Sequence, residues 1–228
     1  MNKLEIKTFL EKLEIIADVY GVCDLSILPD KYRKISEIDI SRFNRAIVIG
    51  IRLAEEVLNT IKDRPTLIYK HHYKTINWIL DQQAFKIEHE LQKNGYRAIA
   101  IPASQTIDWE NQLGHISHKI LGACAGLGWI GKSQLLINPK YGPRVRYVSI
   151  LTNYPFKPTS DKFPESKCGK CNECIKACPA NAITENGLIR EKCIAQLKKF
   201  ASIRGIGQLI CGICIKACPI GRKNEISQ

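Results

Sequence analysis

The sequence predicts an α+β fold in two parts, on the strength of three observations. The first 158 residues alternate apolar strand patterns with amphipathic helical patterns. Residues 154–167 then carry three prolines and no periodicity, which is typical of a linker. Eight of the ten cysteines follow, between residues 168 and 218. We therefore expect an α+β domain over residues 1–158 and a small cysteine-rich domain over residues 159–228.

The pattern of apolar residues predicts the elements of the first domain in chain order. Residues 3–18 place apolar side chains at steps of three and four, as in an amphipathic helix with one buried stripe. The branched apolar run at 45–53 predicts a strand buried on both faces. Residues 66–93 have a long helical periodicity that predicts one or two helices, which end at Asn94-Gly95.

Further strands and a helix complete this domain. Residues 96–104 (YRAIAIPAS) predict the second strand, and residues 112–125 predict another helix. Residues 134–138 and 145–153 predict two strands that are joined by a hairpin-like connection through the turn PKYGPR. This order of strands and helices is typical of an α+β domain.

Composition limits the classes of protein and partner. Hydrophobic residues make up 45% of the chain, which excludes a disordered protein. No window of 18 residues lacks charge, so we expect no membrane-spanning helix, and the start MNKLEIKTFLEKLE is unlike a signal peptide. These features predict a cytoplasmic protein without a membrane partner. The net charge of +12 favours an anionic partner, although a merely basic surface gives the same excess.

The spacing of the cysteines is the strongest functional signal. Four of them follow the pattern C-x2-C-x2-C-x3-C-P of bacterial two-cluster ferredoxins, in which a short loop wraps three corners of one cube and the fourth thiolate serves the other. A second group, CGICIKACP, lacks one member, which the detached Cys193 supplies. We therefore predict two [4Fe–4S] clusters in a ferredoxin-like domain, one held by Cys168, Cys171, Cys174 and Cys218 and the other by Cys178, Cys193, Cys211 and Cys214.

Other interpretations of the cysteines are open. C-x2-C pairs also bind zinc, although zinc sites do not need the C-x3-C-P ends. Cys23 and Cys124 lie outside the pattern among apolar residues, so we expect them to be buried and to pack. The crowded spacing favours a metal in a reducing compartment over disulfides.

Residues 126–133 (GLGWIGKS) satisfy the P-loop pattern G-x4-G-K-[ST] letter for letter. Their context argues against nucleotide hydrolysis, because a P-loop leaves a strand and enters a helix, whereas here a helical pattern comes first and a short strand follows. The three glycines around Trp129 instead let the backbone approach a large planar ligand, with Lys132 meeting a polar group on its rim.

A specific segment precedes the cysteines, because residues 125–153 read AGLGWIGKSQLLINPKYGPRVRYVSILTN. Together with the cysteine pattern and its detached Cys193, this segment resembles the epoxyqueuosine reductase family, over about Ala46 to Pro219. The resemblance implies a nitroreductase-like, corrinoid-binding α+β domain that holds cobalamin and receives electrons through two [4Fe–4S] clusters. It also implies a set of cofactor-binding residues, which are Gly131, Lys132, Leu136 and Gly142 at the corrinoid and Gly212 at the cluster side.

Members of that family that reduce epoxyqueuosine in tRNA carry an aspartate proton donor shortly before this segment. Ungapped counting puts Gln112 at its position, and a shift of four residues brings Asp108 there. We predict Asp108 and His115 as catalytic residues, with His118, three residues further along a helical face, as another candidate proton donor. The competing interpretation is that Asp108 caps a helix and that the histidines have no specific role.

A second cluster of aromatic and polar residues, Tyr69, His72 and Tyr73, faces either a ligand or the sheet. The chain ends soon after Pro219, which predicts a short, divergent family member without the C-terminal helical-repeat extension.

We expect an oxidoreductase, namely an iron–sulfur, cobalamin-dependent reductase that is served by a ferredoxin- or flavodoxin-type electron donor. Its expected partner is tRNA or a corrinoid protein. The alternative is an electron-transfer or corrinoid-activating protein that acts on a partner enzyme. A third interpretation is that the first domain binds a flavin instead of a corrinoid.

Overall fold

The chain forms two compact units in the computed structural model, which describes residues 3–29, 32 and 37–222. The sequence predicts one domain boundary, between residues 158 and 159, whereas the second unit also contains two segments that come earlier in the chain. The predicted boundary stays a prediction. The first unit contains Met1–Ile51, Ile76–Gly128 and Arg146–Glu165, and the second contains Arg52–Thr75, Trp129–Val145 and Ser166–Gln228.

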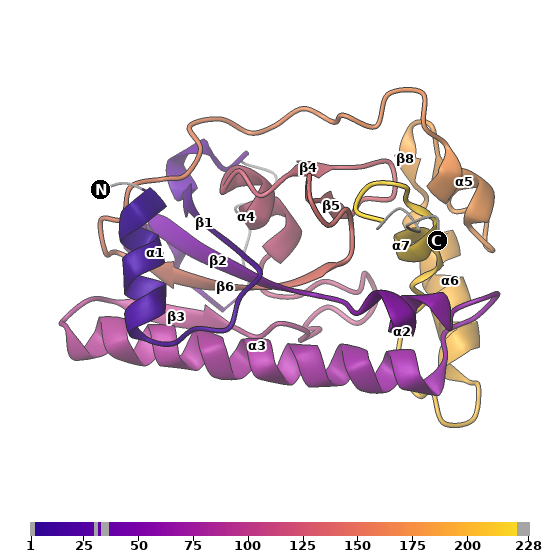
Figure 1. Cartoon of the computed structure of the whole chain (residues 1–228), viewed down its shortest axis with the longest axis horizontal. Coiled ribbons are helices and arrows are strands. Elements are labelled where there is room, and N and C mark those ends of the chain that lie inside the picture. Colours follow the sequence, from indigo (N-terminus) through magenta and orange to yellow (C-terminus); the bar gives the residue numbers. More distant parts are fainter. Residues whose placement is uncertain (1–2, 30–31, 33–36, 223–228) are drawn as a thin grey trace, which may run out of the picture. The chain divides into compact units, whose positions relative to one another are not determined.

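A four-stranded sheet forms the core of the first unit (Figure 1). Val22 lies opposite Ile47 in the antiparallel pair β1–β2, and Ile99 lies opposite Leu151 in the antiparallel pair β3–β6. Residues 46–50 are all buried, which confirms the strand that the sequence predicts to be covered on both faces. In spatial order the strands are β1 (Val19–Asp24), β2 (Arg45–Arg52), β6 (Val145–Thr152) and β3 (Ala98–Ile101).

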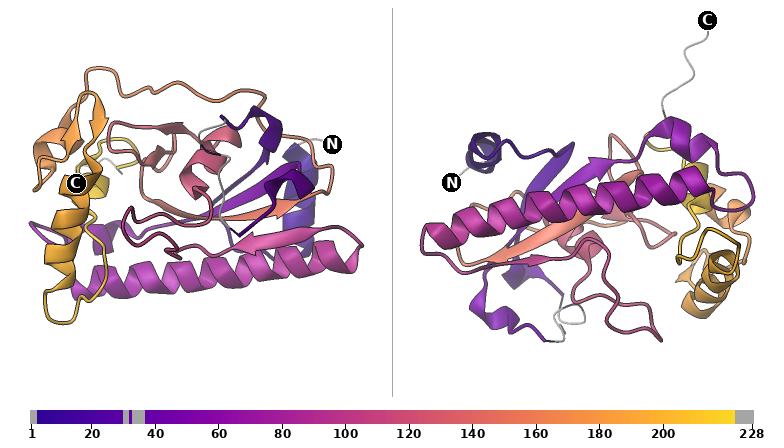
Figure 2. Two further views of the ribbon diagram at one scale, coloured as in Figure 1. Left: turned by 180° about the vertical axis from the view of Figure 1, so that it is seen from behind. Right: turned by 90° about the horizontal axis from the view of Figure 1, so that it is seen from below.

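Helices cover both faces of this sheet. The long helix α3 (Leu67–Lys93) runs along one face, where its buried side chains recur at helical spacing, and α4 (His118–Cys124) lies on the other face (Figures 1 and 2). The first helix α1 (Lys3–Lys12) packs against β1. It is shorter than the predicted 3–18, because the backbone turns into the left-handed region at Glu14, where φ is 51°.

Two short 3₁₀ helices, η1 (Leu25–Ile27) and η3 (Ile40–Arg42), lie on either side of the undescribed residues near position 33. The predicted helix over 112–125 begins only at α4, because Ser117 is its N-cap and accepts a hydrogen bond from the Ile120 amide. The single helix α3 decides between the one or two helices that the periodicity allows.

The predicted hairpin between residues 134–138 and 145–153 is wrong. Instead β5 (Leu136–Ile137) pairs with β4 (Trp129–Ile130) in a separate two-stranded sheet. The following strand β6 lies inside the central sheet, between β2 and β3. Its almost continuous burial explains the choice, since an apolar strand of this kind needs cover on both faces.

The second unit consists of short elements. Helix α5 packs against α7 and against β7, and α2 packs against α7. Within the described part of the chain, no helix has the length and apolar character needed to cross a membrane. The remaining elements of this unit are α2 (Glu55–Asn59), α5 (Glu173–Ala177), β7 (Ile183–Thr184), β8 (Gly187–Leu188), α6 (Arg190–Ala201) and α7 (Ile213–Ala217).

Candidate metal centre

All eight cysteines of the motif lie in the second unit, where two similar loop–helix segments carry seven of them. In each segment the last cysteine is the C-cap of a short helix, and its own backbone is extended. The proline that follows prevents a further helical turn. The positions are Cys168 and Cys171 before α5, Cys174 in it and Cys178 at its end, Cys193 in α6, and Cys211 before α7, Cys214 in it and Cys218 at its end.

The first group of thiols is identified by mutual effects on ionisation. Burial raises the pKa of Cys174, and the thiols of Cys168, Cys218 and Cys171 raise it further. Burial also raises the pKa of Cys218, and Cys168 and Cys171 add to this effect. Such coupling falls off with distance, so these four sulfurs lie close together.

The second group is defined in the same way. Burial raises the pKa of Cys211 to about 11, and Cys193 and Cys178 contribute to the increase. Burial also raises the pKa of Cys214, with further contributions from Cys211, Cys193, Cys174 and Cys178. One thiol of the first group, Cys174, thus also raises the pKa of Cys214. The two groups are therefore adjacent at these two residues. This division is the one that the spacing predicts, and ligation by each thiol stays a prediction.

The chemistry of these donors fits iron–sulfur clusters. Most of these thiols are partly buried. Partly buried thiols that repel one another as thiolates are favoured to ionise by a cationic core, and a metal core supplies that charge. Among the described residues, no three His, Cys, Asp or Glu side chains converge closely enough to hold a single ion. Each thiolate of a [4Fe–4S] cube binds its own iron, so a cube does not require three side chains to converge on one ion.

Lys132 ties down the loop that carries the first group. Its ammonium donates to the carbonyl of Cys171 at 3.1 Å, to Asn172 Oδ1 at 2.7 Å and to Glu185 Oε2 at 2.6 Å. The hydrogen bond from Lys132 also lowers the pKa of Glu185. The sequence singles out Lys132 for the rim of a planar ligand, and the structure places it against the cysteine loop.

The predicted cofactor-binding glycines are positions of close packing in this unit. A Cβ at Gly131 would lie 3.2 Å from Cys168 Sγ and 2.8 Å from Ile137 Cγ1. A Cβ at Gly142 would collide with the carbonyl oxygen of Ile220. Gly212 has a φ of 84°, and a Cβ there would lie 2.6 Å from Ile61 Cδ1 and 3.0 Å from the Tyr69 ring.

Leu136, the remaining predicted cofactor-binding residue, is buried in β5.

The predicted cluster of Tyr69, His72 and Tyr73 packs in the same unit. Tyr69 is 2% exposed, and its ring is 6.3 Å from that of Tyr73. His72 Nε2 accepts a hydrogen bond from the amide of Ala54, the N-cap of α2, at 2.9 Å.

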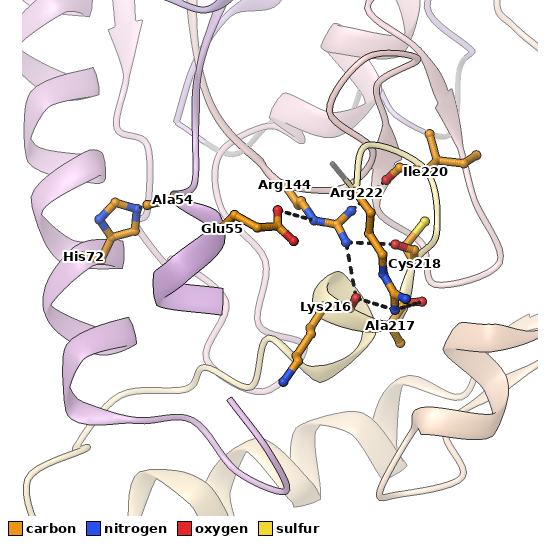
Figure 3. A network of polar contacts seen from close by, with 9 residues as sticks. All are labelled: Ala54, Glu55, His72, Arg144, Lys216, Ala217, Cys218, Ile220 and Arg222. Atoms are coloured by element: carbon orange, nitrogen blue, oxygen red, sulfur yellow. Dashed lines mark hydrogen bonds and ion pairs between the residues drawn. The ribbon is translucent and has the colours of Figure 1, made fainter. Parts of the chain in front are cut away.

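Sequence reasoning missed Arg144, which binds the loop around Cys218 (Figure 3). Its side chain is almost completely buried, and it donates to the carbonyls of Ile220 at 2.7 Å, Cys218 at 2.9 Å and Lys216 at 3.3 Å. Its Nε forms an ion pair with Glu55 Oε2 at 3.2 Å. No local pattern reveals this role, because the carbonyl partners are 72 to 76 residues away in the sequence.

The predicted catalytic residues lie in the first unit. The Asp108 carboxylate accepts hydrogen bonds from the amide and the side chain of Asn111, at 2.8 and 2.9 Å, within a turn in which residue 108 pairs with Leu113. His115 Nδ1 lies 3.7 Å from Glu37 Oε2. The catalytic role of Asp108 and His115 stays a prediction.

His118 has contacts that fix its imidazole. Its Nδ1 is 2.9 Å from Ser149 Oγ, and its Nε2 is 3.0 Å from the Pro102 carbonyl oxygen. Burial lowers the pKa of His118 to about 4, and Arg146 adds to this effect against the opposing hydrogen bond with Pro102. A histidine that is neutral at physiological pH suits a structural role in this position.

The two cysteines outside the motif are fully buried in the first unit, which confirms the predicted packing. A hydrogen bond between their thiols raises the pKa of Cys23, and burial raises it further. Cys23 and Cys124 thus hold β1 next to α4, and they supply internal controls for the cluster cysteines.

Comparisons with known proteins agree with this site. A profile of the 4Fe-4S binding domain matches residues 162–184. The epoxyqueuosine reductase of Aliivibrio fischeri is 33% identical over 169 residues, which cover 70% of this chain and 42% of that protein. The chain therefore spans less than half the length of this relative. The sequence match confirms the predicted resemblance to the epoxyqueuosine reductases.

Solved structures share the fold. A catabolic reductive dehalogenase in complex with 3-bromo-4-hydroxybenzoic acid matches with a TM-score of 0.65 at 21% identity, over 92% of this chain and 30% of the other. An epoxyqueuosine reductase with an epoxyqueuosine-modified tRNA stem loop matches with a TM-score of 0.63 at 21% identity, over 96% and 66% of the two chains. The chain has the α+β architecture with a ferredoxin-like part that the sequence predicts.

Proposed function

We propose that this chain, a relative of the epoxyqueuosine reductases, is an iron–sulfur, cobalamin-dependent reductase. One observation carries the proposal, namely that the eight thiols of the second unit form two groups of four that meet at Cys174 and Cys214. The profile match ends at residue 184, so the members beyond it are supported by their spacing and geometry. Two adjacent cubes suit a protein that delivers electrons to a reaction.

Each group is proposed to hold one cluster. When bound, the clusters supply one-electron transfer, and the cobalamin supplies a low-valent cobalt. This chain's own residues hold and orient the thiolates. Lys132 fixes the loop at Cys171, Gly131 lets that loop approach β5, and Arg144 fixes the loop at Cys218.

The residues that the family resemblance assigns to the corrinoid give no separate support for it. The Lys132 ammonium already has three oxygen partners. The space beside Gly131 and Gly142 is filled by Ile137, Cys168 and Ile220. We propose cobalamin only because of the similarity to the epoxyqueuosine reductases. The assignment of the first unit as a nitroreductase-like, corrinoid-binding domain has the same support.

The proposed substrate is tRNA that carries epoxyqueuosine, because a structural relative was solved with such a stem loop and the net charge of +12 attracts polyanions. Removal of an epoxide oxygen as water takes up two electrons and two protons. Asp108 and His115 are the proposed proton donors, and a ferredoxin- or flavodoxin-type protein is the proposed source of electrons.

An electron-transfer or corrinoid-activating role is the second candidate, and Gln112 favours it. This residue occupies the position of the proton-donating aspartate by direct counting, and an amide does not supply a proton. Its side chain donates to the Trp109 carbonyl at 2.6 Å, and its backbone is left-handed with a φ of 53°. In this case a corrinoid protein replaces tRNA as the partner.

Anaerobic turnover separates the two roles. Protein with reconstituted clusters is titrated with cobalamin, then supplied with a reductant and a stem loop that contains epoxyqueuosine. The reductase proposal predicts a corrinoid spectrum and loss of one oxygen from the nucleoside by mass spectrometry. Asp108→Asn is expected to keep the corrinoid spectrum and to reduce the loss of oxygen, because this carboxyl is a proposed proton donor. Clusters and bound cobalamin without any turnover favour the activator role, and a flavin spectrum without corrinoid binding contradicts both.

A further inference from the structure

Arg144 is a buried cation beside a predicted cluster ligand. It lies directly before β6 and is 1% exposed. Three of its hydrogen bonds go to backbone carbonyls at the end of α7 and in the turn after it, which carry Cys218. Its guanidinium therefore binds the backbone before Cys218, at Cys218 and after it (Figure 3).

These three hydrogen bonds fix the position of the loop from Lys216 to Ile220. A planar guanidinium donates in fixed directions, so three carbonyls bound to one fork leave little freedom for the chain between them. Close packing adds to this constraint, because the Ile220 carbonyl also presses against Gly142. A cluster ligand in this loop is thereby held through its backbone carbonyl.

Arg144 and its partner Glu55 bring opposite charges to this loop. A cube of core charge 2+ with four thiolates carries 2− overall, and uptake of one electron makes it 3−. A buried positive charge stabilises the more negative state and raises the reduction potential, while a nearby negative charge lowers it. Glu55 is 3.2 Å from Arg144 Nε, and its side chain is 32% exposed, so water screens its charge more than that of Arg144.

Arg222 provides a matched comparison. It donates to the carbonyls of Lys216 and Ala217, both at 3.0 Å, and so binds the same loop as Arg144. However, Arg222 is exposed. Solvent screens an exposed charge much more strongly than a buried one, so the two arginines differ in electrostatic effect although they share a backbone acceptor.

We propose that Arg144 is a positioning residue that holds the Cys218 loop and raises the reduction potential of the cluster at Cys168, Cys171, Cys174 and Cys218, with Glu55 as the opposing charge. The inference rests on the proposed clusters. The electron for the reduction comes from a ferredoxin- or flavodoxin-type donor, and the cluster passes from its oxidised to its one-electron reduced state without loss of iron or sulfide.

The test is an anaerobic redox titration of the full-length protein with both clusters, followed by electron paramagnetic resonance. Arg144→Gln is expected to lower the potential of one cluster and Glu55→Gln to raise the potential of the same cluster. A tenfold change in the equilibrium constant of reduction corresponds to about 59 mV for one electron. We expect about tenfold for Arg144→Gln, less for Glu55→Gln, and a smaller decrease for Arg222→Gln. Arg144→Lys, which keeps the charge, is expected to restore most of the potential.

The opposite signs separate electrostatics from simple loosening of the loop. The proposal is overturned if both clusters keep their potentials in Arg144→Gln, or if Arg144→Gln and Glu55→Gln shift a potential in the same direction. If Arg144→Gln loses a cluster, Glu55→Gln decides by the sign of its shift. A wild-type protein without two clusters refutes the proposed function, whereas two clusters that ignore these substitutions refute this inference only.

Discussion

Cys193 is the most informative single residue of the proposed centre, because it is detached from both motif segments and lies on α6. Its thiol contributes to the pKa of Cys211 and of Cys214, which places it in the second group. A motif search that counts only closely spaced cysteines omits it. Its membership follows from the need for a fourth ligand and from the geometry of the folded chain.

Cys193→Ser is predicted to lose one cluster and keep the other. Iron content should fall by about four atoms per chain, because each cube holds about four. Cys23→Ser is the matched control, since Cys23 is buried in the first unit and outside both groups, and it should keep full iron content. Chemical iron analysis of anaerobic protein measures both, and undiminished iron in Cys193→Ser would refute the crossed assignment.

His118 is predicted to make the stability of the first unit depend on pH. The folded protein keeps this imidazole neutral down to about pH 4, whereas the ordinary pKa of 6.5 applies to the unfolded chain. The unfolded state thus binds the extra proton between these values, so the free energy of unfolding is highest above about pH 6.5 and decreases as the pH falls towards 4, by about 3 kcal/mol at most.

Denaturant unfolding of wild type and His118→Gln at pH 7 and pH 5 measures this effect. The variant is expected to be less stable than wild type at pH 7, where it lacks the bonds to Ser149 and Pro102, and to lose less stability on acidification. Acid loss of clusters affects both proteins alike. Equal losses in the two proteins would contradict the neutral state of His118 in the folded protein.

At the scale of elements, α3 and the two short cysteine helices determine where the thiols lie. Residues 171–180 (CNECIKACPA) and 211–220 (CGICIKACPI) are similar in sequence, and they contain α5 and α7, which pack against each other. Residues of the first turns of α3 belong to the second unit, and there Tyr69 packs against the backbone at Gly212, next to Cys211. This packing links a helix far upstream to the second group of cysteines.

Gly212→Ala is predicted to reduce stability and iron content together. A left-handed alanine costs about 1–2 kcal/mol, and the clash with Ile61 and Tyr69 adds about 1–3 kcal/mol. Gly95→Ala is the matched control, because its φ of 81° is almost the same as the 84° of Gly212 and nothing lies within 4 Å of its added Cβ. Denaturant unfolding and iron analysis of both variants isolate the clash, and equal behaviour of the two would contradict it.

The elements show where sequence reasoning succeeds and where it does not. Strand β2 and helix α3 are predictable because their apolar pattern is long and regular. The pairing of β5 is not predictable from the local sequence, because the turn PKYGPR is compatible with a hairpin. Strand β6 instead lies in the central sheet, where both of its faces are buried. Arg144 is outside the reach of any local pattern, since its partners meet it only in the folded chain.

At the scale of the whole molecule, charge and chain path matter most. The net charge is +12 before any cluster is bound, and two oxidised clusters with their thiolates reduce it by about four. The cysteine spacing predicts which thiols group together, but not that residues 52–75 and 129–145 join their unit. That partition depends on long-range packing, because α3 and the strands leading out of the sheet continue from one unit into the other.

Binding of a tRNA stem loop is predicted to weaken steeply with salt. Each neutralised phosphate contributes to a linear decrease of log affinity with log salt concentration, with a slope of about −0.7 to −0.9 per phosphate. Fluorescence anisotropy with a labelled stem loop, at several salt concentrations, measures the slope. A neutral polymer of similar size serves as the control. Absence of binding at low salt would contradict tRNA as the partner and favour the activator role.

The central claim is that two sets of four thiols each hold an iron–sulfur cube. The most direct measurement is metal and acid-labile sulfide analysis of protein that has been purified and reconstituted without oxygen. The account predicts about eight irons and about eight sulfides per chain, with no stoichiometric zinc. Zinc in place of iron, or iron for only one cluster, would contradict it.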